Sequence, residues 1–237
     1  MIYAIIAAGE GSRLTEEGYT GLKPMVLLNG EMLIDRLIKV FVANSAESII
    51  IIINEKSEAL KSHLEQLQLD VPVHILVKDT PSSLHSFDEI LKFKPDAAAM
   101  CLTTTDTIFE EAEFGAYIEA FQADTSNHGL MAVTSFIDDE SPLYVDFDSN
   151  HNITAFSDTV TPTSTSVSGG IYCLRKEALN VARISVAQGV SRMRNFQKAI
   201  LTNNLTLKAY PFSKIIDIDH VADIEKAQAF LDETSIF

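Results

Sequence analysis

The chain has 237 residues, of which 46% are hydrophobic and 22% charged, and its formal net charge is −15. At roughly 100–200 residues per domain this length suits one large domain, and the composition is that of a globular protein and not of a disordered chain. The excess of negative charge argues against a nucleic-acid polymer as partner, because binding a phosphate backbone requires clustered lysine and arginine.

Three further features concern the compartment and the membrane. Cys101 and Cys173 each lie inside an apolar run, which indicates buried thiols in a reducing environment and not a disulfide framework or a metal site. The longest apolar runs are far shorter than the about 20 residues that cross a bilayer. The N-terminus has no basic segment of the kind that begins a secretory signal. We therefore expect a cytoplasmic protein without a membrane span.

The first half of the chain alternates short apolar runs with amphipathic segments. The isoleucine run at 49–53 has no polar alternation, which is typical of a parallel strand covered on both faces. With right-handed crossovers, this order predicts a doubly wound, mostly parallel sheet. The predicted strands are 2–8, 48–53, 73–77 and 97–102, and the predicted helices are 32–43, 57–67 and 84–93.

From about residue 129 the pattern changes to short strands joined by turns. Residues 148–152 read as a hairpin connection, and 159–168, rich in threonine and serine, as a flexible loop. Two helices are expected near the C-terminus. The predicted strands are 130–136, 144–147, 153–156, 170–174 and 205–210, and the predicted helices are 188–201 and 221–231.

A glycine loop follows the first strand directly, as Ala7-Ala8-Gly9-Glu10-Gly11-Ser12-Arg13-Leu14, and Lys23-Pro24 comes soon after. Without Cβ atoms, Gly9 and Gly11 let the backbone amides approach an anion closely. Arg13 and Lys23 add positive charge. Pro24 favours an extended Lys23, so we expect the lysine to reach across the loop outside any helix.

Other readings of this loop are weaker. Two glycines after a strand can form an ordinary turn. A dinucleotide-binding fingerprint needs glycine where Leu14 stands, and a P-loop needs Gly-Lys-Ser/Thr inside the loop. The spacing therefore favours a phosphate pocket of a different kind.

Aspartates follow the predicted strands at two other places. Asp106 comes after the strand at 97–102, and ligands of open α/β sheets bind beyond such strand ends. Asp217 and Asp219 lie in an extended segment before the last helix, so their side chains share one side. Mg²⁺ commonly takes one or two carboxylates together with substrate phosphates. Capping of a helix is the alternative role for Asp106 and Asp219.

The loop and the following L-K-P-M resemble the opening signature of the nucleotidyltransferase superfamily. Its members include sugar-phosphate nucleotidylyltransferases, phosphocholine cytidylyltransferases and molybdenum-cofactor guanylyltransferases. The segment from Asp217 to Asp223 resembles the D-I-D-x-x-x-D segment of many small members. The resemblance implies a single domain over residues 1–237, a Rossmann-like mixed sheet. Its nucleotide-binding half would cover 1–127, and its β-rich acceptor-side extension and C-terminal helices 128–237.

The resemblance also implies roles for particular residues. Arg13 would hold the β- and γ-phosphates and Lys23 the transferred phosphoryl group. Asp106 and Asp219 would bind the catalytic Mg²⁺, with Asp217 in reserve. Ser86, in T-P-S-S-L-H-S, matches a serine of the nucleotide loop, although a capped loop before a helix explains it equally well. The implied nucleotide-binding residues are Ala7, Ala8, Gly9, Gly11, Ser12, Arg13 and Ser86.

Two departures concern the metal and acceptor sides. Thr105 stands where the superfamily usually has glycine before the metal-binding aspartate, and Ser157-Asp158 stands where many sugar-phosphate members have Glu-Lys. Gly169-Gly170 matches the acceptor strand, or forms a simple bulge. Either Lys214, Arg192 or Arg194 replaces the missing lysine, or the acceptor is not a sugar 1-phosphate.

The implied activity is Mg²⁺-dependent transfer of a nucleoside monophosphate from a nucleoside triphosphate to a phosphorylated small molecule, with release of pyrophosphate. The two departures leave open a catalytically silent nucleotide- or sugar-binding regulator on the same fold. A metal-dependent glycosyltransferase, which also uses an open α/β sheet and a D-x-D pair, is disfavoured because it has no use for the glycine loop.

Overall fold

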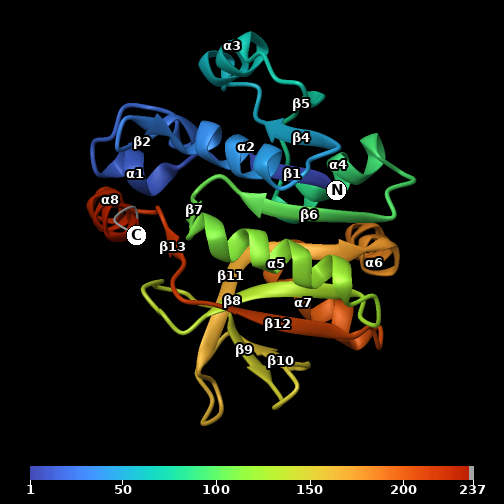
Figure 1. Cartoon of the computed structure of the whole chain (residues 1–237). Coiled ribbons are helices and arrows are strands. Elements are labelled where there is room, and N and C mark those ends of the chain that lie inside the picture. Colours follow the sequence, from blue (N-terminus) through green and yellow to red (C-terminus); the bar gives the residue numbers. More distant parts are fainter. Residues whose placement is uncertain (235–237) are drawn as a thin grey trace.

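Isoleucine-rich β4 (Ser48–Ile53) lies inside a nine-stranded sheet, and all six of its residues are buried. The computed structural model describes residues 1–234 (Figure 1). Parallel pairing places β1 (Ile2–Ala7) on one side of β4 and β5 (Val73–Val77) on the other, and β6 (Ala99–Thr104) beyond β1. This part of the sheet is entirely parallel, as the sequence predicts.

Antiparallel strands extend the sheet past β6. The ten-residue strand β11 (Ser166–Arg175) pairs with β6 and β8 (Gly129–Thr134), and its first residues also pair with β9 (Tyr144–Phe147). The hairpin partner of β9 is β10 (Ile153–Ser157), and β12 (Leu207–Phe212) pairs in parallel with β8. One mixed sheet therefore carries both halves of the chain.

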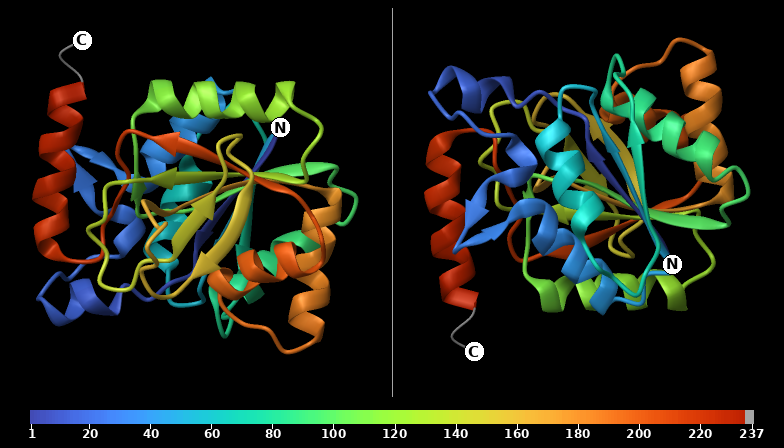
Figure 2. Two further views of the ribbon diagram at one scale, coloured as in Figure 1. Left: turned by 90° about the horizontal axis from the view of Figure 1, so that it is seen from below. Right: turned by 90° about the horizontal axis from the view of Figure 1, so that it is seen from above.

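Helices cover both faces of this sheet (Figure 2). Ile50 and Ile52 pack into a core with α4, α6 and α7, whereas Ile49 and Ile51 pack into a second core with α2, α3 and α5. The alternation follows from the period of two along a strand. The helices are α2 (Leu33–Ala43), α3 (Glu58–Gln66), α4 (Ser83–Phe93), α5 (Glu111–Ala123), α6 (Lys176–Ala187) and α7 (Met193–Thr202).

A third, smaller core joins the two ends of the chain. Leu14 and Leu28 from the N-terminal segment pack with Ile218, Ala227 and Phe230. Figure 1 shows α8 beside the N-terminal α1 and β2. The elements here are α1 (Ser12–Glu16), the 3₁₀ turn η1 (Lys23–Met25), β2 (Leu27–Leu28), β3 (Glu31–Met32), β7 (Thr107–Ile108), β13 (Ile216–Asp217) and α8 (Val221–Thr234).

The predicted helix at 188–201 is wrong in its first part, and the predictions omit α5 and α6. Helix α6 ends before Gly189, which has a left-handed backbone (φ +81°), and Arg192 (φ +69°) is non-helical immediately before α7. The predicted loop at 159–168 is also too long, because Ser166 already begins β11. Buried Ala178, Leu179 and Ala182 carry the helical spacing that would have indicated α6.

Candidate active site

The loop after β1 and the turn after β6 meet at one edge of the sheet. From β1 the chain winds through β4 to β5 and then returns to β6 on the opposite side of β1. Ligands of doubly wound sheets bind at such a switch point, beyond the carboxyl ends of the strands. The fold therefore brings the glycine loop next to Thr105-Asp106.

A cavity of about 580 Å³ opens at this edge, and it is lined by all residues predicted to bind nucleotide. Lys23, Asp106 and Asp219 line it as well. The remaining walls come from the residues after β6 and from the loop between β5 and α4. The predicted nucleotide-binding residues that line it are Ala7, Ala8, Gly9, Gly11, Ser12, Arg13 and Ser86.

Glycine is needed at the two loop positions for different structural reasons. Gly11 adopts a left-handed backbone (φ +61°), and a Cβ there would lie 3.1 Å from Cβ of Lys23. Gly9 has no atom within 4 Å of the position where its Cβ would be. Gly11 is thus required by the turn itself, whereas Gly9 keeps the cavity wall bare.

Lys23 holds the two predicted metal ligands together. Its ammonium lies 2.5 Å from Asp106 Oδ2 and 2.8 Å from Asp219 Oδ1, and only 13% of the side chain is exposed. The prediction that Lys23 lies outside any helix is wrong, since it begins the 3₁₀ turn η1. Leu22 before it is extended instead, and Pro24 occupies the start of the turn, where its missing N–H costs nothing.

Charges decide the protonation of this cluster. Burial works against the Lys23 ammonium, but Asp106 and Asp219 outweigh it and raise the pKa of the lysine above its ordinary value. Burial likewise disfavours the Asp106 carboxylate, yet the Lys23 charge and hydrogen bond lower its pKa. Lys23 and Asp106 are therefore both ionised at neutral pH.

Arg13 adds a second cation on the outer side. Its guanidinium donates to Asp219 Oδ2 at 2.6 Å, and 45% of its side chain is exposed. Asp219 consequently accepts from Arg13 with one oxygen and from Lys23 with the other. Both cations predicted to hold phosphates are thus held by one carboxylate.

The bonding of the two carboxylates suits a metal site. Asp106 Oδ1 is buried and accepts no hydrogen bond from any residue in 1–234, so it is a free oxygen ligand beside the Lys23 pair. Across those residues, no group of three or more Asp, Glu, His or Cys side chains is arranged around a common point as metal ligands. Two carboxylates, Asp106 and Asp219, fit an ion that takes its remaining ligands from water and phosphate.

The predicted reserve ligand, Asp217, lies apart from this pair. Its exposed side chain lines a neighbouring pocket and not the nucleotide cavity. Although the side chain is exposed, partial desolvation by the surrounding chain and the negative charges of Asp106 and Asp219 raise its pKa above the ordinary value. Asp217 therefore belongs to the acidic lining of the neighbouring pocket and not to the Lys23 cluster.

The loop before α4 is held by hydroxyl groups. The Ser86 hydroxyl is 2.6 Å from that of Thr80, and Ser86 is 2% exposed. The Ser82 hydroxyl accepts a hydrogen bond of 3.2 Å from the backbone N–H of Arg192. Ser86 thus shapes the loop that lines the cavity, whereas the Arg192 backbone ties this loop to the start of α7.

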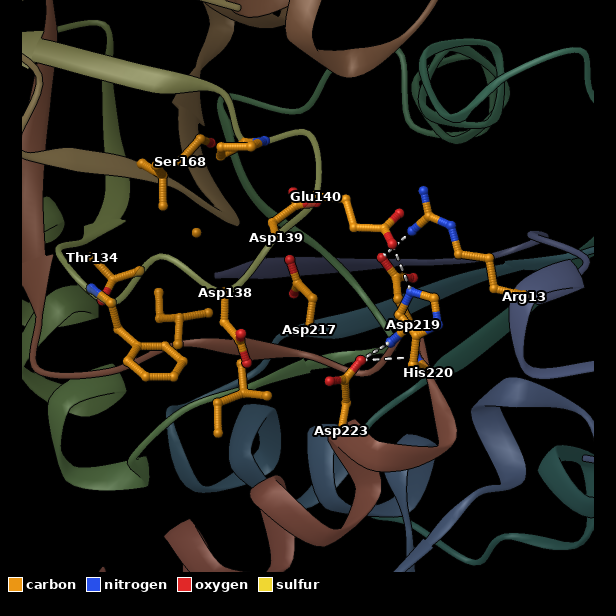
Figure 3. Close-up of a pocket in the computed structure, with 16 residues that line it drawn as sticks. Arg13, Thr134, Asp138, Asp139, Glu140, Ser168, Asp217, Asp219, His220 and Asp223 are labelled. Atoms are coloured by element: carbon orange, nitrogen blue, oxygen red, sulfur yellow. Dashed lines mark hydrogen bonds and ion pairs between the residues drawn. The ribbon is translucent and has the colours of Figure 1, made fainter. Parts of the chain in front are cut away.

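The second pocket is small, about 50 Å³, and adjoins the first through Arg13 and Asp219, which line both (Figure 3). Carboxylates dominate its walls, and Figure 3 shows several of them pointing towards one another. The positive groups on its walls are Arg13 and, when protonated, His220. Its acidic residues are Asp138, Asp139, Glu140, Asp217, Asp219 and Asp223.

Of the three predicted acceptor residues, Gly169 lines this pocket. A Cβ on Gly169 would lie 2.2 Å from Cδ1 of Ile215, so the glycine makes room for core packing. Gly170 has φ +74° at a register shift between β11 and β8, which is the bulge considered as an alternative. Lys214 is not among the pocket residues; its ammonium lies 4.5 Å from the ring centre of Phe136.

Basic residues of α7 surround the position of the missing acceptor lysine. Arg194 donates to Asp158 Oδ1 at 3.0 Å and to the Ser141 carbonyl at 2.7 Å. Lys198 pairs with the other Asp158 oxygen. Asp158 thus collects two cations beside β10, close to the loop of the acidic pocket.

Comparison with known proteins supports the resemblance. A profile described as nucleotidyl transferase matches residues 3–234. The chain belongs to the nucleotidyl transferase family. A relative from Sulfolobus acidocaldarius (strain ATCC 33909), provisionally described as a mannose-1-phosphate guanyltransferase, is 23% identical over 214 residues. The alignment covers 90% of this chain but 58% of the relative, so the chain spans little more than half of that protein.

Solved structures show the same nucleotidyl transferase fold. An inositol-1-phosphate CTP transferase from T. maritima matches with a TM-score of 0.82 and 16% identity, over 99% of this chain and 96% of that one. A provisionally described glucose-1-phosphate thymidylyltransferase from Bacillus anthracis matches with a TM-score of 0.83 and 18% identity, over 97% and 95% of the two chains. The predicted α/β fold is therefore confirmed.

Two structural groups were not predicted as part of the site. Asp138, Asp139 and Glu140 form the acidic run that lines the second pocket, and the clustering of charge is their signal in the sequence. Glu17 and Asp223 bind the backbone at the start of α8, beside Asp219.

Across residues 1–234, helices are all too short or too polar for a bilayer crossing.

Proposed function

We propose that this protein transfers a nucleoside monophosphate from a nucleoside triphosphate to a phosphorylated small-molecule acceptor and releases pyrophosphate. The observation that supports this most is the Arg13–Asp219–Lys23–Asp106 chain of ion pairs on the wall of the glycine-loop cavity. Family membership agrees with the activity. The acceptor would be a sugar phosphate or a phospho-alcohol, and the divalent cation Mg²⁺.

The residues that would hold Mg²⁺ are Asp106 and Asp219. When bound, the ion would supply positive charge to the phosphates. The free Oδ1 of Asp106 supports this assignment. Asp217, in the adjoining pocket, stays a reserve ligand.

The chain's own cations carry the remaining steps. A triphosphate in the cavity offers Lys23 and Arg13 anionic partners in place of Asp106 and Asp219, so the carboxylates are released as the phosphates arrive. Arg13 would then steady the leaving pyrophosphate and Lys23 the α-phosphate. A phosphate-monoester acceptor, with a second pKa near 6, is already mostly ionised at neutral pH, so no general base is required.

Positioning is therefore the main contribution of the protein. The loop amides at Gly9 and Gly11 and the loop containing Ser86 would orient the nucleotide. On the acceptor side, Gly169 lines the pocket, whereas Gly170 and Lys214 lie outside its walls. Arg192 and Arg194 remain candidates for the acceptor phosphate, and the acidic lining disfavours acceptors with further negative charge.

The test measures Mg²⁺-dependent pyrophosphate release from CTP, GTP, UTP, ATP and dTTP with pooled sugar phosphates and phospho-alcohols. Lys23→Ala and Asp106→Ala are each expected to lower kcat/KM at least roughly 100-fold. Lys39→Ala is the matched control, because this exposed lysine pairs with Glu31 at the surface and lines no part of the cavity.

Three outcomes would change the proposal. Nucleotide binding without pyrophosphate release, unaffected by Asp106→Ala, indicates a silent regulator. A requirement for a preformed nucleotide sugar as donor indicates a glycosyltransferase. Absence of any nucleotide binding contradicts the assignment of the glycine loop.

A further inference from the structure

Asp219 lies where β13 leads into α8, at a place where several backbone N–H groups have no partner within the helix. The first N–H groups of a helix have no partner within the helix. Here the consecutive N–H groups of Asp219, His220 and Val221 all donate to side-chain carboxylates. The accepting residues are Asp223, inside the first turn of α8, and Glu17, which follows α1.

Asp223 forms the inner part of this arrangement. Its Oδ2 accepts from the N–H of Asp219 at 3.1 Å and from that of His220 at 2.8 Å. Its Oδ1 is 3.2 Å from the Lys226 ammonium, and the residue is 7% exposed. The bond to His220 is the reverse half of a capping box, in which a carboxylate at the third helical position accepts from the residue before the helix.

Glu17 forms the outer part and comes from the other end of the chain. Its Oε2 accepts from the N–H of Val221 at 2.7 Å, and its Oε1 from Nδ1 of His220 at 2.5 Å. Glu17 directly follows α1, which begins with Ser12 and Arg13 of the glycine loop. It therefore connects the nucleotide loop to the backbone that carries Asp219.

A further bond holds the other side of Asp219. The N–H of Ile218 donates to the backbone carbonyl of Asp106 at 3.0 Å, and Ile218 is fully buried. The Asp219 backbone is thus held from both directions, towards Asp106 and towards α8. Its carboxylate is left to meet Lys23 and Arg13.

The hydrogen bonds also distinguish the residues that hold the backbone from those that would bind the metal. Both oxygens of Glu17 and both of Asp223 have partners from the chain itself, whereas Asp106 keeps a buried oxygen without one. Glu17 and Asp223 are therefore engaged in holding the backbone, whereas the oxygens of Asp219 are held by Lys23 and Arg13, which phosphates can bind instead.

We propose that Asp223 and Glu17 are positioning residues that fix Asp219 against Asp106 and couple it to the glycine loop. This inference rests on the proposed function, in which Asp219 binds the divalent ion. Groups that orient metal ligands usually matter through geometry, and removing them costs roughly 10–100-fold in metal affinity or activity.

The experiment compares Asp223→Ala with Asp223→Asn, and Glu17→Ala with Glu17→Gln, by titrating Mn²⁺ alone and with a non-hydrolysable nucleoside triphosphate. Each alanine variant is expected to weaken Mn²⁺ binding at least roughly tenfold. The amide variants keep an oxygen acceptor for the backbone N–H groups, so they are expected to recover most of that loss.

Asp232→Ala is the matched control. Asp232 also joins α8 to the N-terminal segment, through a 2.7 Å bond from Asn29, but it touches neither Asp219 nor His220. This variant is expected to bind Mn²⁺ like the wild type. All titrations are made well below the Tm of each variant, so that unfolding does not enter the comparison.

Two results would overturn the inference: unchanged Mn²⁺ affinity in both alanine variants, or equal losses in Asp223→Asn and Asp223→Ala, which would show that the charge itself binds the ion. Lack of pyrophosphate release by the wild type would remove the proposed function but leave these titrations valid. Should the wild type bind no Mn²⁺, a crystal structure of Asp223→Ala decides. In it, an Asp219 carboxylate still paired with Arg13 and Lys23 would contradict positioning.

Discussion

Lys23 contacts two carboxylates in a protein whose formal net charge is −15. Such a protein repels a polyphosphate at long range, so a nucleotide site depends on local cations and backbone amides. Arg13 and Lys23 provide those cations beside the glycine loop, and both are held in place by Asp219. At the scale of single residues, the cavity is therefore organised around this carboxylate.

We expect alanine substitutions at the two loop glycines to have different effects, one on nucleotide binding and the other on stability. Gly9→Ala should leave the Tm unchanged, because no protein atom lies within 4 Å of the new methyl, but weaken nucleotide binding roughly tenfold by filling the cavity wall. Gly11→Ala should cost about 1–2 kcal/mol of stability, because its backbone is left-handed and Lys23 is close. Thermal unfolding and calorimetric titration separate them; equal Tm losses would contradict this assignment.

Replacing Asp217 by asparagine is expected to stabilise the protein in a pH-dependent way. Its folded pKa is raised, so the folded protein binds its proton more tightly than the unfolded chain does. The carboxylate therefore lowers stability as the pH rises from its ordinary pKa through the raised one. Asp217→Asn should raise the Tm at pH 7 by roughly 2 °C, reduced by solvent screening, and the gain should vanish below about pH 4. A Tm gain that is equal at both pH values would show a cause other than charge.

At the scale of elements, β11 shapes the acceptor side. The strand pairs with β6 over its second half, whereas a register shift around Gly169-Gly170 changes its pairing with β8. The bulge packs Gly170 against Thr107, whose hydroxyl would lie 3.1 Å from a Cβ there. Gly170 thus lets the acceptor strand pack closely against the residues that follow Asp106, whereas Gly169 makes room for Ile215.

Gly169→Ala tests this packing. The added methyl would overlap Cδ1 of Ile215, so we expect a loss of about 1–3 kcal/mol in the free energy of unfolding. Ile215→Val removes that methyl group and should recover part of the loss in the double variant. Chemical denaturation of the four proteins gives the coupling energy, and strictly additive effects would contradict the contact.

The whole molecule is tied together across its two halves. The sheet continues from β6 to β11, and Tyr117 of α5 binds both β8 and β11: its hydroxyl donates to the Leu130 carbonyl at 2.6 Å and accepts from the Cys173 N–H at 2.8 Å. Tyr117 is fully buried. These links favour the predicted single domain over a pair of independent units.

Tyr117→Phe tests this coupling. Removing the hydroxyl leaves a buried carbonyl and N–H without it, so stability should fall by about 1–3 kcal/mol. One cooperative transition should persist, with near-ultraviolet and far-ultraviolet circular dichroism coinciding. Two separated transitions in the wild type would instead show that residues 1–127 and 128–237 unfold independently.

Local patterns predict much of this fold because strand and helix periods are read from neighbouring residues. The parallel strands, the 148–152 hairpin and α8 follow from such patterns. The break between α6 and α7 does not, since it depends on positive φ values at Gly189 and Arg192. Lys23 likewise begins a 3₁₀ turn, which tolerates Pro24 because proline is accepted at the first positions of a helix.

The sequence by itself determined the order of strands along the chain, the glycine loop with Arg13 and Lys23, and the aspartates near the ends of extended segments. Only the tertiary structure decided that Asp106 and Asp219 share Lys23, that Asp217 faces a second, acidic pocket, and that Glu17 and Asp223 hold the Asp219 backbone. The physical reason is distance along the chain: Glu17 and Val221 are 204 residues apart, and only folding brings them together.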